Sequence, residues 1–363
     1  MRKVRFGVVG LKGIGQTHLR AIASTEEAQL LAVADIDEGV GKSTSSQYGV
    51  EWYRDYEKML ELNDVDAVTI CTPHFLHAPM AVKALHSGKH VLVEKPMAIT
   101  VKEADGMVEK ARSKNAKLGV VFQYRTNPTN REIKRLIDTG ELGRIYRVCM
   151  EACNFRTQAY YNRDAWRGKW ATEGGGALIN QTIHELDLLQ WFVGKPSRLL
   201  GQISTMYHNV EVEDIASATV LFENGAHGII QLGIVDPIRT ERLEICGEKG
   251  TIVTEGGKTK RAILGKNLKE LVAEEAAWPK PAAPQFLDVE PKEIMGGGHG
   301  AVMKDFARAI LEDREPLVNG EDGRTSLEIV NAIILSSFEA KPVTFPINRE
   351  AYSNLIRRLS KKG

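Results

Sequence analysis

The first third of the chain alternates short apolar runs with amphipathic stretches. The apolar runs are rich in β-branched residues, which is typical of strands that are covered on both faces of a parallel sheet. They predict strands at Arg5–Val9, Leu30–Ala34, Ala67–Cys71, His90–Val93 and Leu118–Phe122. The stretches between them predict helices at Gly15–Ser24, Val40–Tyr48, His77–Ser87 and Val101–Ser113. This alternation indicates an α/β fold with a doubly wound parallel sheet.

The pattern changes near Tyr124, beyond which longer strands dominate. We expect these strands at Ile145–Asn154, Gly201–Tyr207, Ile215–Phe222, His227–Val235 and Arg242–Cys246. Turn signals at Glu223–Gly225 and Gly247–Gly250 join consecutive strands, as in an antiparallel sheet. Helical spacing recurs at Asn130–Asp138, Ala177–Phe192, Ala301–Glu312 and Arg324–Ala340.

Length and composition indicate the number of domains. At roughly 100–200 residues per domain, a chain of 363 residues is expected to form two. We place the boundary where the pattern changes, between residues 1–123 and 124–363. The stretch Thr254–Gly298 is rich in Lys, Pro, Ala and Gly, and we expect it to be a peripheral excursion and not a linker between domains.

The charge balance excludes several classes of partner. The chain has 48 Lys and Arg against 47 Asp and Glu, so nothing in its charge points to nucleic acid or to a membrane surface. No apolar run reaches the ~18 residues that a membrane span needs. The four cysteines form no CxxC pair, which fits small packing residues in a reducing cytoplasm.

A glycine-rich turn follows the first strand and opens the first helix. It runs through Gly10, Lys12, Gly13, Ile14 and Gly15. Such a turn brings backbone N–H groups and a helix N-terminus up to a pyrophosphate. The usual pattern has glycine at the third position, where this chain has Lys12. That side chain must either point away or add its charge to the phosphates. The alternative is that this segment is an ordinary tight turn between a strand and a helix.

The end of the second strand strengthens the nucleotide interpretation. Asp35 closes that strand and lies twenty residues after Gly15. A carboxylate there accepts hydrogen bonds from a ribose diol and repels a 2′-phosphate, so NAD is favoured over NADP. The alternative is that Asp35 simply caps the next helix.

Two longer motifs resemble one enzyme family. One consists of Cys71–His77 followed by Gly88–Pro96, with the letters Glu-Lys-Pro at its end; the other is Glu173–Asp187, which begins EGGGALINQ. Together they resemble the glucose-fructose oxidoreductase and inositol dehydrogenase family (Gfo/Idh/MocA), and the likeness spans nearly the whole chain. One departure is His74, where many members have Asn.

The resemblance implies a fold, a cofactor and an assembly. It implies a Rossmann domain that binds NAD, followed by a substrate-binding α+β domain with a large open, mainly antiparallel sheet. The outer face of that sheet commonly builds homodimers or homotetramers. The resemblance also implies that Thr72, His77, Glu94 and Lys95 line the nicotinamide side of the cofactor, with Trp166 and Arg167 approaching from the second domain.

Lys95 and His184 are the candidate catalytic residues. Lys95 lies just beyond a predicted parallel strand, at the sheet edge where open α/β folds bind ligands. Desolvation beside a nicotinamide cation would lower the pKa of Lys95 and make proton exchange feasible near neutral pH. His184 could hydrogen-bond the reacting hydroxyl and relay its proton. A surface lysine and a buried core histidine are the structural alternatives.

Asn180 and Asp187 lie on the expected face of the His184 helix, four residues before and three after it. Asp187 could orient His184, or it could form an ordinary helix salt bridge. By resemblance, inositol dehydrogenases carry Asp at position 180, whereas sugar-acting members, including nucleotide-sugar 3-dehydrogenases, often carry Asn. Asn180 is no base, so this position favours a pyranose or pyranoside over inositol.

Further polar residues are candidates for contacts with the ligands. Gln123 is a candidate for both cofactor and substrate, while Tyr160, Tyr161 and Arg163 are candidates for the substrate. Aromatic faces suit a sugar ring, although core packing is an equally plain explanation. No set of Cys, His and carboxylate residues has the spacing of a metal site, so no metal is expected.

The sequence therefore predicts an NAD(H)-dependent oxidoreductase that acts on a sugar or cyclic polyol. Three alternatives stay open at this point: an inositol 2-dehydrogenase, an NAD-dependent glycoside hydrolase that uses transient oxidation, and a non-catalytic NAD(H)-binding sensor.

Overall fold

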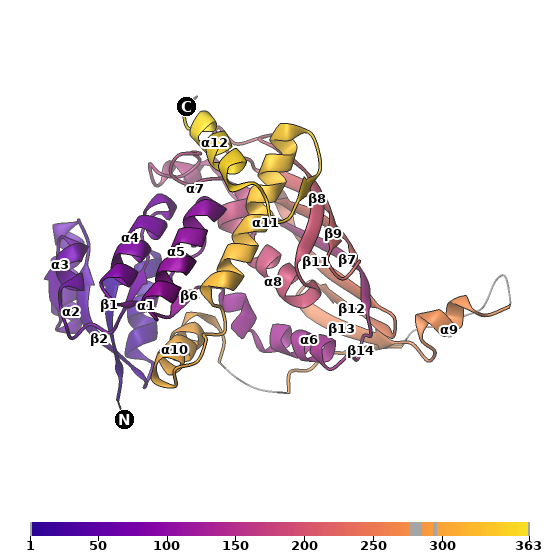
Figure 1. The fold of residues 1–363 in the computed structure, drawn as a ribbon, viewed down its shortest axis with the longest axis horizontal. Helices are drawn as coiled ribbons and strands as arrows, with labels where there is room; N and C mark the ends of the chain where they lie inside the picture. The colour runs from indigo at the N-terminus through magenta and orange to yellow at the C-terminus, as the bar shows by residue number, and fades with distance from the viewer. Residues whose placement is uncertain (1, 276–284, 293–295, 362–363) are drawn as a thin grey trace.

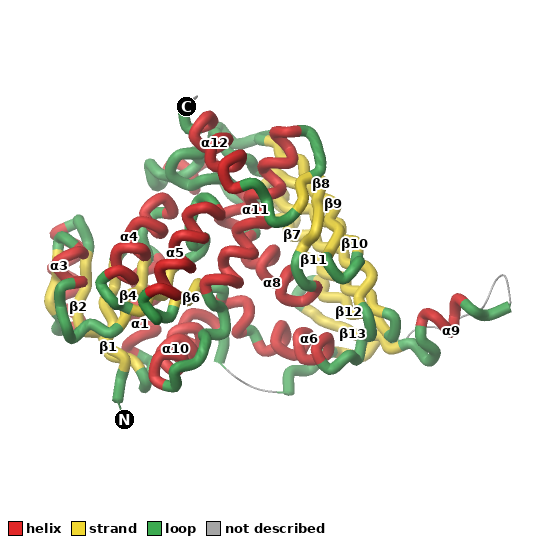
Figure 2. The backbone as a smooth tube through the Cα atoms, viewed as in Figure 1, coloured by secondary structure: helices red, strands yellow, loops and turns green. Residues whose placement is uncertain are grey.

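The computed structural model describes residues 2–275, 285–292 and 296–361, which form two sheets with helices between and around them (Figures 1 and 2). One sheet belongs to the first third of the chain and the other to the remainder. None of the described helices is long and apolar enough to span a membrane.

The first part of the chain forms a six-stranded sheet in which every neighbouring pair is parallel. Its elements are β1 (Val4–Val9), α1 (Ile14–Ala23), β2 (Ala28–Ala34), α2 (Glu38–Tyr48), β3 (Glu51–Tyr53), α3 (Tyr56–Leu60), β4 (Ala67–Ile70), α4 (His74–His86), β5 (His90–Val93), α5 (Val101–Ser113) and β6 (Leu118–Val120). The strand order is β3-β2-β1-β4-β5-β6, so the order in which successive strands are added to the sheet reverses between β1 and β4. Ligands bind open α/β sheets in the crevice at such a reversal, and the predicted Rossmann sheet is confirmed.

The second part forms a nine-stranded sheet with its own helices. Its elements are η1 (Gln123–Thr126), α6 (Pro128–Asp138), β7 (Ile145–Phe155), α7 (Gln158–Asn162), the π-helical turn η2 (Ala177–Gln181), α8 (Ile183–Val193), β8 (Pro196–Ser204), β9 (Ile215–Phe222), β10 (His227–Gly233), β11 (Val235–Gly247), β12 (Gly250–Glu255), β13 (Lys258–Ile263), α9 (Leu268–Val272), β14 (Phe286–Asp288), α10 (Gly298–Leu311), α11 (Gly320–Glu339), β15 (Val343–Thr344) and α12 (Arg349–Leu359). The strand order is β14-β13-β12-β11-β7-β10-β9-β8-β15. Only the β7–β10 pair is parallel, so the sheet is mainly antiparallel, as expected.

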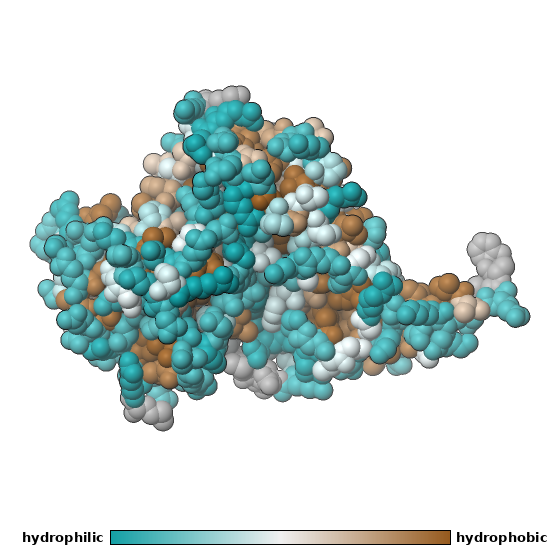
Figure 3. All heavy atoms as spheres, viewed as in Figure 1, coloured by the Kyte–Doolittle hydropathy of each residue, from teal (hydrophilic) through white to brown (hydrophobic). Residues whose placement is uncertain are grey.

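The two sheets differ in how they are covered. In β4 all four residues are buried, because helices pack on both faces. Along β7 the residues Val148, Met150 and Ala152 are buried while the residues between them are partly exposed, because helices cover one face only. The surface seen in Figure 3 is mostly hydrophilic, with apolar atoms along the projecting segment that carries α9.

Two predicted features of the second part are wrong. The predicted helix Ala177–Phe192 is two elements, since Thr182 N donates to Ala177 O in a π-helical turn and α8 starts afresh at Ile183. Glu213 caps the first element, because its carboxylate accepts the N–H groups of Gly176 and Leu178 at the start of that turn.

The stretch Thr254–Gly298 is not wholly a peripheral excursion. Its start completes β12 and forms β13, which extend the second sheet as a hairpin. Gly256 and Gly257 both have positive φ at the hairpin turn, which is the type of turn that suits paired glycines. Within the same stretch, residues 276–284 and 293–295 lie outside the described residues.

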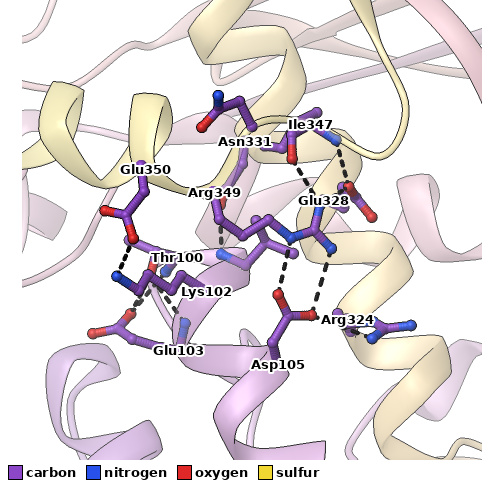
Figure 4. A network of polar contacts seen from close by, with 12 residues as sticks. Thr100, Lys102, Glu103, Asp105, Arg324, Glu328, Asn331, Ile347, Arg349 and Glu350 are labelled. Carbon is purple, nitrogen blue, oxygen red and sulfur yellow. Dashed lines mark hydrogen bonds and ion pairs between the residues drawn. The ribbon is translucent and has the colours of Figure 1, made fainter.

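Helix α11 holds the two sheets together. It packs against α5 and β6 of the first sheet and against β8 of the second. Figure 4 shows the polar network at this junction, in which Arg349 faces Asp105 at 2.9 Å and Arg324 approaches the same carboxylate at 3.2 Å. Asn331 of α11 accepts a hydrogen bond from Val101 N, at the start of α5, at 2.8 Å. Because α5 leads from β5, this network determines where the end of β5 lies relative to the second sheet.

The junction gives a first prediction about stability. Asn331 is fully buried, and its amide also donates to Ile99 O at 3.2 Å. Asn331→Ala leaves a buried N–H and a buried C=O without partners, which should lower the free energy of unfolding by about 2 kcal/mol. Urea denaturation measures the change. Lys102→Ala is the matched control, because Lys102 pairs with Glu350 at the same junction but in solvent. A loss of stability in Lys102→Ala as large as that in Asn331→Ala would contradict the idea that the buried hydrogen bonds of Asn331 matter most.

Candidate active site

A cavity of about 680 Å³ opens at the carboxyl ends of the parallel strands and faces the second sheet's helices. The predicted site residues that line it are Gly10, Lys12, Gly13, Ile14, Asp35, Thr72, His77, Glu94, Lys95, Gln123, Arg163, Trp166, Arg167, Asn180 and His184. Segments far apart in the sequence thus meet in one place. Residues that the sequence prediction missed include Arg54 and Tyr56, which carried no motif of their own.

Three predicted residues lie beside the cavity and do not line it. Gly15 sits under the glycine-rich turn, where an added Cβ would come within 2.0 Å of Gly10 O. Tyr161 is buried in a small apolar cluster with Ala177 and Ile234, so core packing describes it. Tyr160 lies in a second layer, where its hydroxyl accepts hydrogen bonds from neighbouring side chains and its ring packs against Tyr161.

The glycine-rich turn brings backbone close to the cavity. Gly10 has φ of 86°, and a Cβ there would lie 2.8 Å from Cys71 O, so only glycine fits. Helix α1 begins after Gly13 without a side-chain cap. Gly15 N and Gln16 N donate to Lys12 O and Gly13 O, and the helix N-terminus lies at the cavity that Gly13 and Ile14 line. A helix N-terminus suits a pyrophosphate.

Asp35 fastens this turn to the end of β2. One carboxylate oxygen accepts from Leu11 N and the other from Asp37 N, both at 2.8 Å. The helix cap belongs instead to Asp37, which accepts from Val40 N and so removes that alternative for Asp35. Lys12 bonds Asp37 at 2.7 Å at the exposed rim, so its charge points away from the turn. Asp35 also lines the cavity, so it lies within reach of a ligand there.

Lys95 joins the two parts of the chain. Its Nζ donates to Asn180 O at 2.7 Å and lies 3.3 Å from Asn180 Oδ1. Burial lowers the pKa of Lys95, and the neighbouring Glu94 carboxylate opposes that shift. A lysine whose charged form is disfavoured in this way releases its proton more readily than a lysine in solvent.

His184 lies next to Lys95 in an apolar setting. Its ring stacks on Tyr124, with centroids 4.7 Å apart, and meets Phe122 edge-on at 5.6 Å. Burial lowers the pKa of His184 well below its usual value, so the ring is neutral. Among the described residues its buried Nδ1 has no hydrogen-bond partner, and neither has Gln123 Oε1.

Asp187 does not orient His184. Its two carboxylate oxygens accept from Arg125, each at 2.8 Å, and one also accepts from Ser326. The pair is almost wholly buried and ties α8 to η1 and α11. Of the two hypotheses for Asp187, the structure supports the salt bridge.

Glu94 is held as an anion on the cavity wall. Its Oε1 lies 2.8 Å from His18 Nε2 and 3.4 Å from His299 Nε2. These two rings hold the pKa of Glu94 well below its usual range. Among the described residues this is the group whose ligand atoms lie close enough for one metal ion, but its contacts are already those of hydrogen-bonded side chains. That no metal is needed stays a prediction.

The remaining predicted residues brace the wall. His77 is buried, with its two ring nitrogens each 2.7 Å from a backbone carbonyl oxygen, of Pro96 and of Thr72, so it supports these segments and offers no free nitrogen. From the second part, the Arg167 guanidinium lies 4.4 Å from the Trp166 ring and bonds Asp164. Arg163 lies at the rim with two thirds of its side chain exposed.

Comparison with known proteins agrees with this geometry. Residues 4–122 match the model "Oxidoreductase family, NAD-binding Rossmann fold", and residues 130–253 match the GFO/IDH/MocA C-terminal domain. An uncharacterized oxidoreductase of Synechocystis is 30% identical over 70% of this chain and 72% of its own length. The scyllo-inositol 2-dehydrogenase (NAD(+)) of Bacillus subtilis is 26% identical over 97% of this chain and 99% of its own length.

A solved structure extends the likeness to the whole fold. The WlbA dehydrogenase of Bordetella pertussis, determined in complex with NADH and UDP-GlcNAcA, is 29% identical and superposes with a TM-score of 0.82 over 96% of this chain and 100% of its own. The resemblance expected from the motifs is thereby confirmed. The chain belongs to the Gfo/Idh/MocA family of NAD-binding oxidoreductases.

Proposed function

We propose that the protein transfers hydride between NAD and a hydroxyl or keto carbon of a sugar, a pyranose or pyranoside, with a cyclic polyol as the related alternative. The observation that carries the proposal is the contact of Lys95 with Asn180 beside His184, in the cavity that the glycine-rich turn enters. When bound, NAD⁺ would supply the hydride acceptor for the substrate carbon. Gly10, the first turn of α1 and Asp35 would hold its phosphates and ribose.

The geometry of Lys95 suits it to take the hydroxyl proton. A neutral amine has two N–H groups and one lone pair. The two N–H groups have Asn180 O and Oδ1 as acceptors, which turns the lone pair toward the cavity. The substrate hydroxyl can then donate its proton to Nζ as hydride leaves the carbon. His184, which is neutral and lines the cavity beside Lys95, would hold the same hydroxyl in line.

The proposed substrate class rests on two supports. One relative is a scyllo-inositol 2-dehydrogenase, and another was determined in complex with UDP-GlcNAcA. In this chain the position that faces Lys95 is an amide, Asn180, and the motif resemblance associates that amide with sugar-acting members. A pyranoside is therefore the preferred substrate, with inositol as the second choice.

The proposal also covers the oligomeric state, the domain boundaries and the cellular location of the protein. Leu200 and Ile229, 47% and 59% exposed, both pair with Thr219 of β9, so they lie on one face of the second sheet. Such an apolar face supports a homodimer or homotetramer built on the sheet. We also propose domains at residues 1–123 and 124–363 and a cytoplasmic location, which the four free cysteines support.

The first functional prediction concerns Lys95. Lys95→Ala removes the proton acceptor and should lower kcat by about 10²- to 10⁴-fold. NADH formation is measured with a panel of pyranosides, inositols and keto sugars, and NADH affinity by fluorescence is the control. Absence of wild-type turnover on every compound would contradict the proposed reaction. Glycoside cleavage without net NADH formation would instead indicate the NAD-dependent glycoside hydrolase. Normal cellular function of the Lys95→Ala variant would indicate the non-catalytic NAD(H)-binding sensor.

A second prediction concerns the choice of cofactor. Asp35→Asn keeps an oxygen for Leu11 N but removes the charge that repels a 2′-phosphate. The ratio of the Kd values for NADPH and NADH should fall by about tenfold. Calorimetric titration of both cofactors measures it. Asp37→Asn, at the rim beside Lys12, is the matched control; an equal effect there would show that general surface charge decides the preference.

A further inference from the structure

We propose that Glu173 is a positioning residue for the proton transfer: it fixes which end of the Asn180 amide faces Lys95, so that Glu173 and Asn180 together do the work of one carboxylate beside the amine. This inference rests on the proposed function, in which Lys95 accepts the proton. Glu173 precedes the three glycines and is fully buried.

The first step is the contact between the two side chains. Asn180 Nδ2 donates to Glu173 Oε1 at 2.5 Å, while Asn180 Oδ1 faces Lys95 Nζ at 3.3 Å. A carboxylate only accepts hydrogen bonds, so it selects the NH₂ end of the amide. The oxygen end must then face the amine. Without this selection Asn180 could present NH₂ to Lys95, and donor would meet donor.

The second step is that Glu173 itself cannot turn. Its Oε2 accepts from Gly168 N at 2.5 Å, and its backbone oxygen lies 2.9 Å from His74 Nδ1 of α4. Gly168 has φ of 72°, and an added Cβ there would meet Val210 at 2.7 Å, so the loop that carries this N–H is closely fitted. The carboxylate is therefore anchored at one oxygen and directs Asn180 with the other.

The third step is charge. The Glu173 carboxylate lies one amide behind Lys95 and raises the pKa of Lys95, opposing the effect of burial. Burial raises the pKa of Glu173 itself to about 6, while its hydrogen bonds favour the ionised form. The charged and titratable groups that face Glu173 are Arg167, Lys95, Glu213, Tyr160, Tyr161 and His74. Above pH ~6 the pair thus delivers a negative charge and a correctly oriented oxygen.

The test exchanges the polarity of the pair. Glu173→Gln offers one acceptor oxygen where two N–H groups need acceptors, so Gly168 N or Asn180 Nδ2 loses its partner. Asn180→Asp places two carboxylates against each other. In the double variant Glu173→Gln with Asn180→Asp, the new amide at position 173 donates to the new carboxylate at position 180. The total charge of the pair is unchanged. We expect each single variant to lose about 10²-fold in kcat and the double variant to be more active than either.

The titration of Lys95 provides a readout that needs no substrate. NMR of ¹³C-labelled lysine in the NAD⁺-bound protein, assigned with Lys95→Gln, follows its pKa. Glu173→Gln removes a negative charge and should lower the pKa of Lys95, whereas the double variant places the charge in direct contact and should raise it, by about one unit each. In sugar oxidation the acid limb of kcat/KM should move in the same order, because Lys95 must be deprotonated.

Glu211→Gln is the matched control, because Glu211 accepts an N–H from Trp170 of the same loop without touching Asn180; it should leave the pKa of Lys95 unchanged. Opposite pKa shifts with a recovered double variant support the proposal. Where Glu173→Gln fails to fold, an active double variant with a raised pKa of Lys95 supports it. A wild-type pKa in Glu173→Gln, or a double variant no better than the singles, overturns it. Ordered pKa shifts without turnover on any sugar would overturn the proposed function alone.

Discussion

The hydrogen bond from Lys95 to the second part of the chain is the contact on which the site depends. It places an amine from the end of a parallel strand against a carbonyl oxygen and an amide oxygen of η2 at 2.7 and 3.3 Å. Burial opposes the charge on that amine, and the acceptors occupy its N–H groups. The same contact therefore affects both the proton affinity of the Lys95 amine and the direction in which that amine points. Neither part of the chain could do this alone.

Such a contact requires that two sheets be held in a constant relation. Helix α11 provides this, since Asn331 bonds the first N–H of α5 and Ser326 bonds Asp187 of α8. The buried pair of Asp187 with Arg125 then ties α8 to η1, next to Gln123. A hydrogen bond loses its strength within a few tenths of an ångström. The polar groups around the site thus act by holding Lys95 and Asn180 in position, although they lie outside the cavity.

The buried acids near the glycine run share a second feature. Glu213 accepts backbone N–H groups of the π-helical turn, and Glu173 accepts one from the loop before it. Burial raises the pKa of Glu213 to about 7 and that of Glu173 to about 6. These carboxylates accept N–H groups at or before the start of η2, which have no helical partners there, and so help to hold the segment that carries Asn180.

The sequence by itself determined the features that are written in neighbouring residues. The alternation of strands and helices, the glycine-rich turn, Asp35 and the Glu94–Pro96 segment could all be recognised, because each depends on local backbone geometry and short spacing. Only the tertiary structure decided which distant side chains meet. It joined Lys95 to Asn180, gave Asp187 to Arg125 instead of His184, split the expected helix at Thr182 and brought Glu173 behind the amide. These contacts depend on how two sheets pack across α11, and no local pattern encodes that distance.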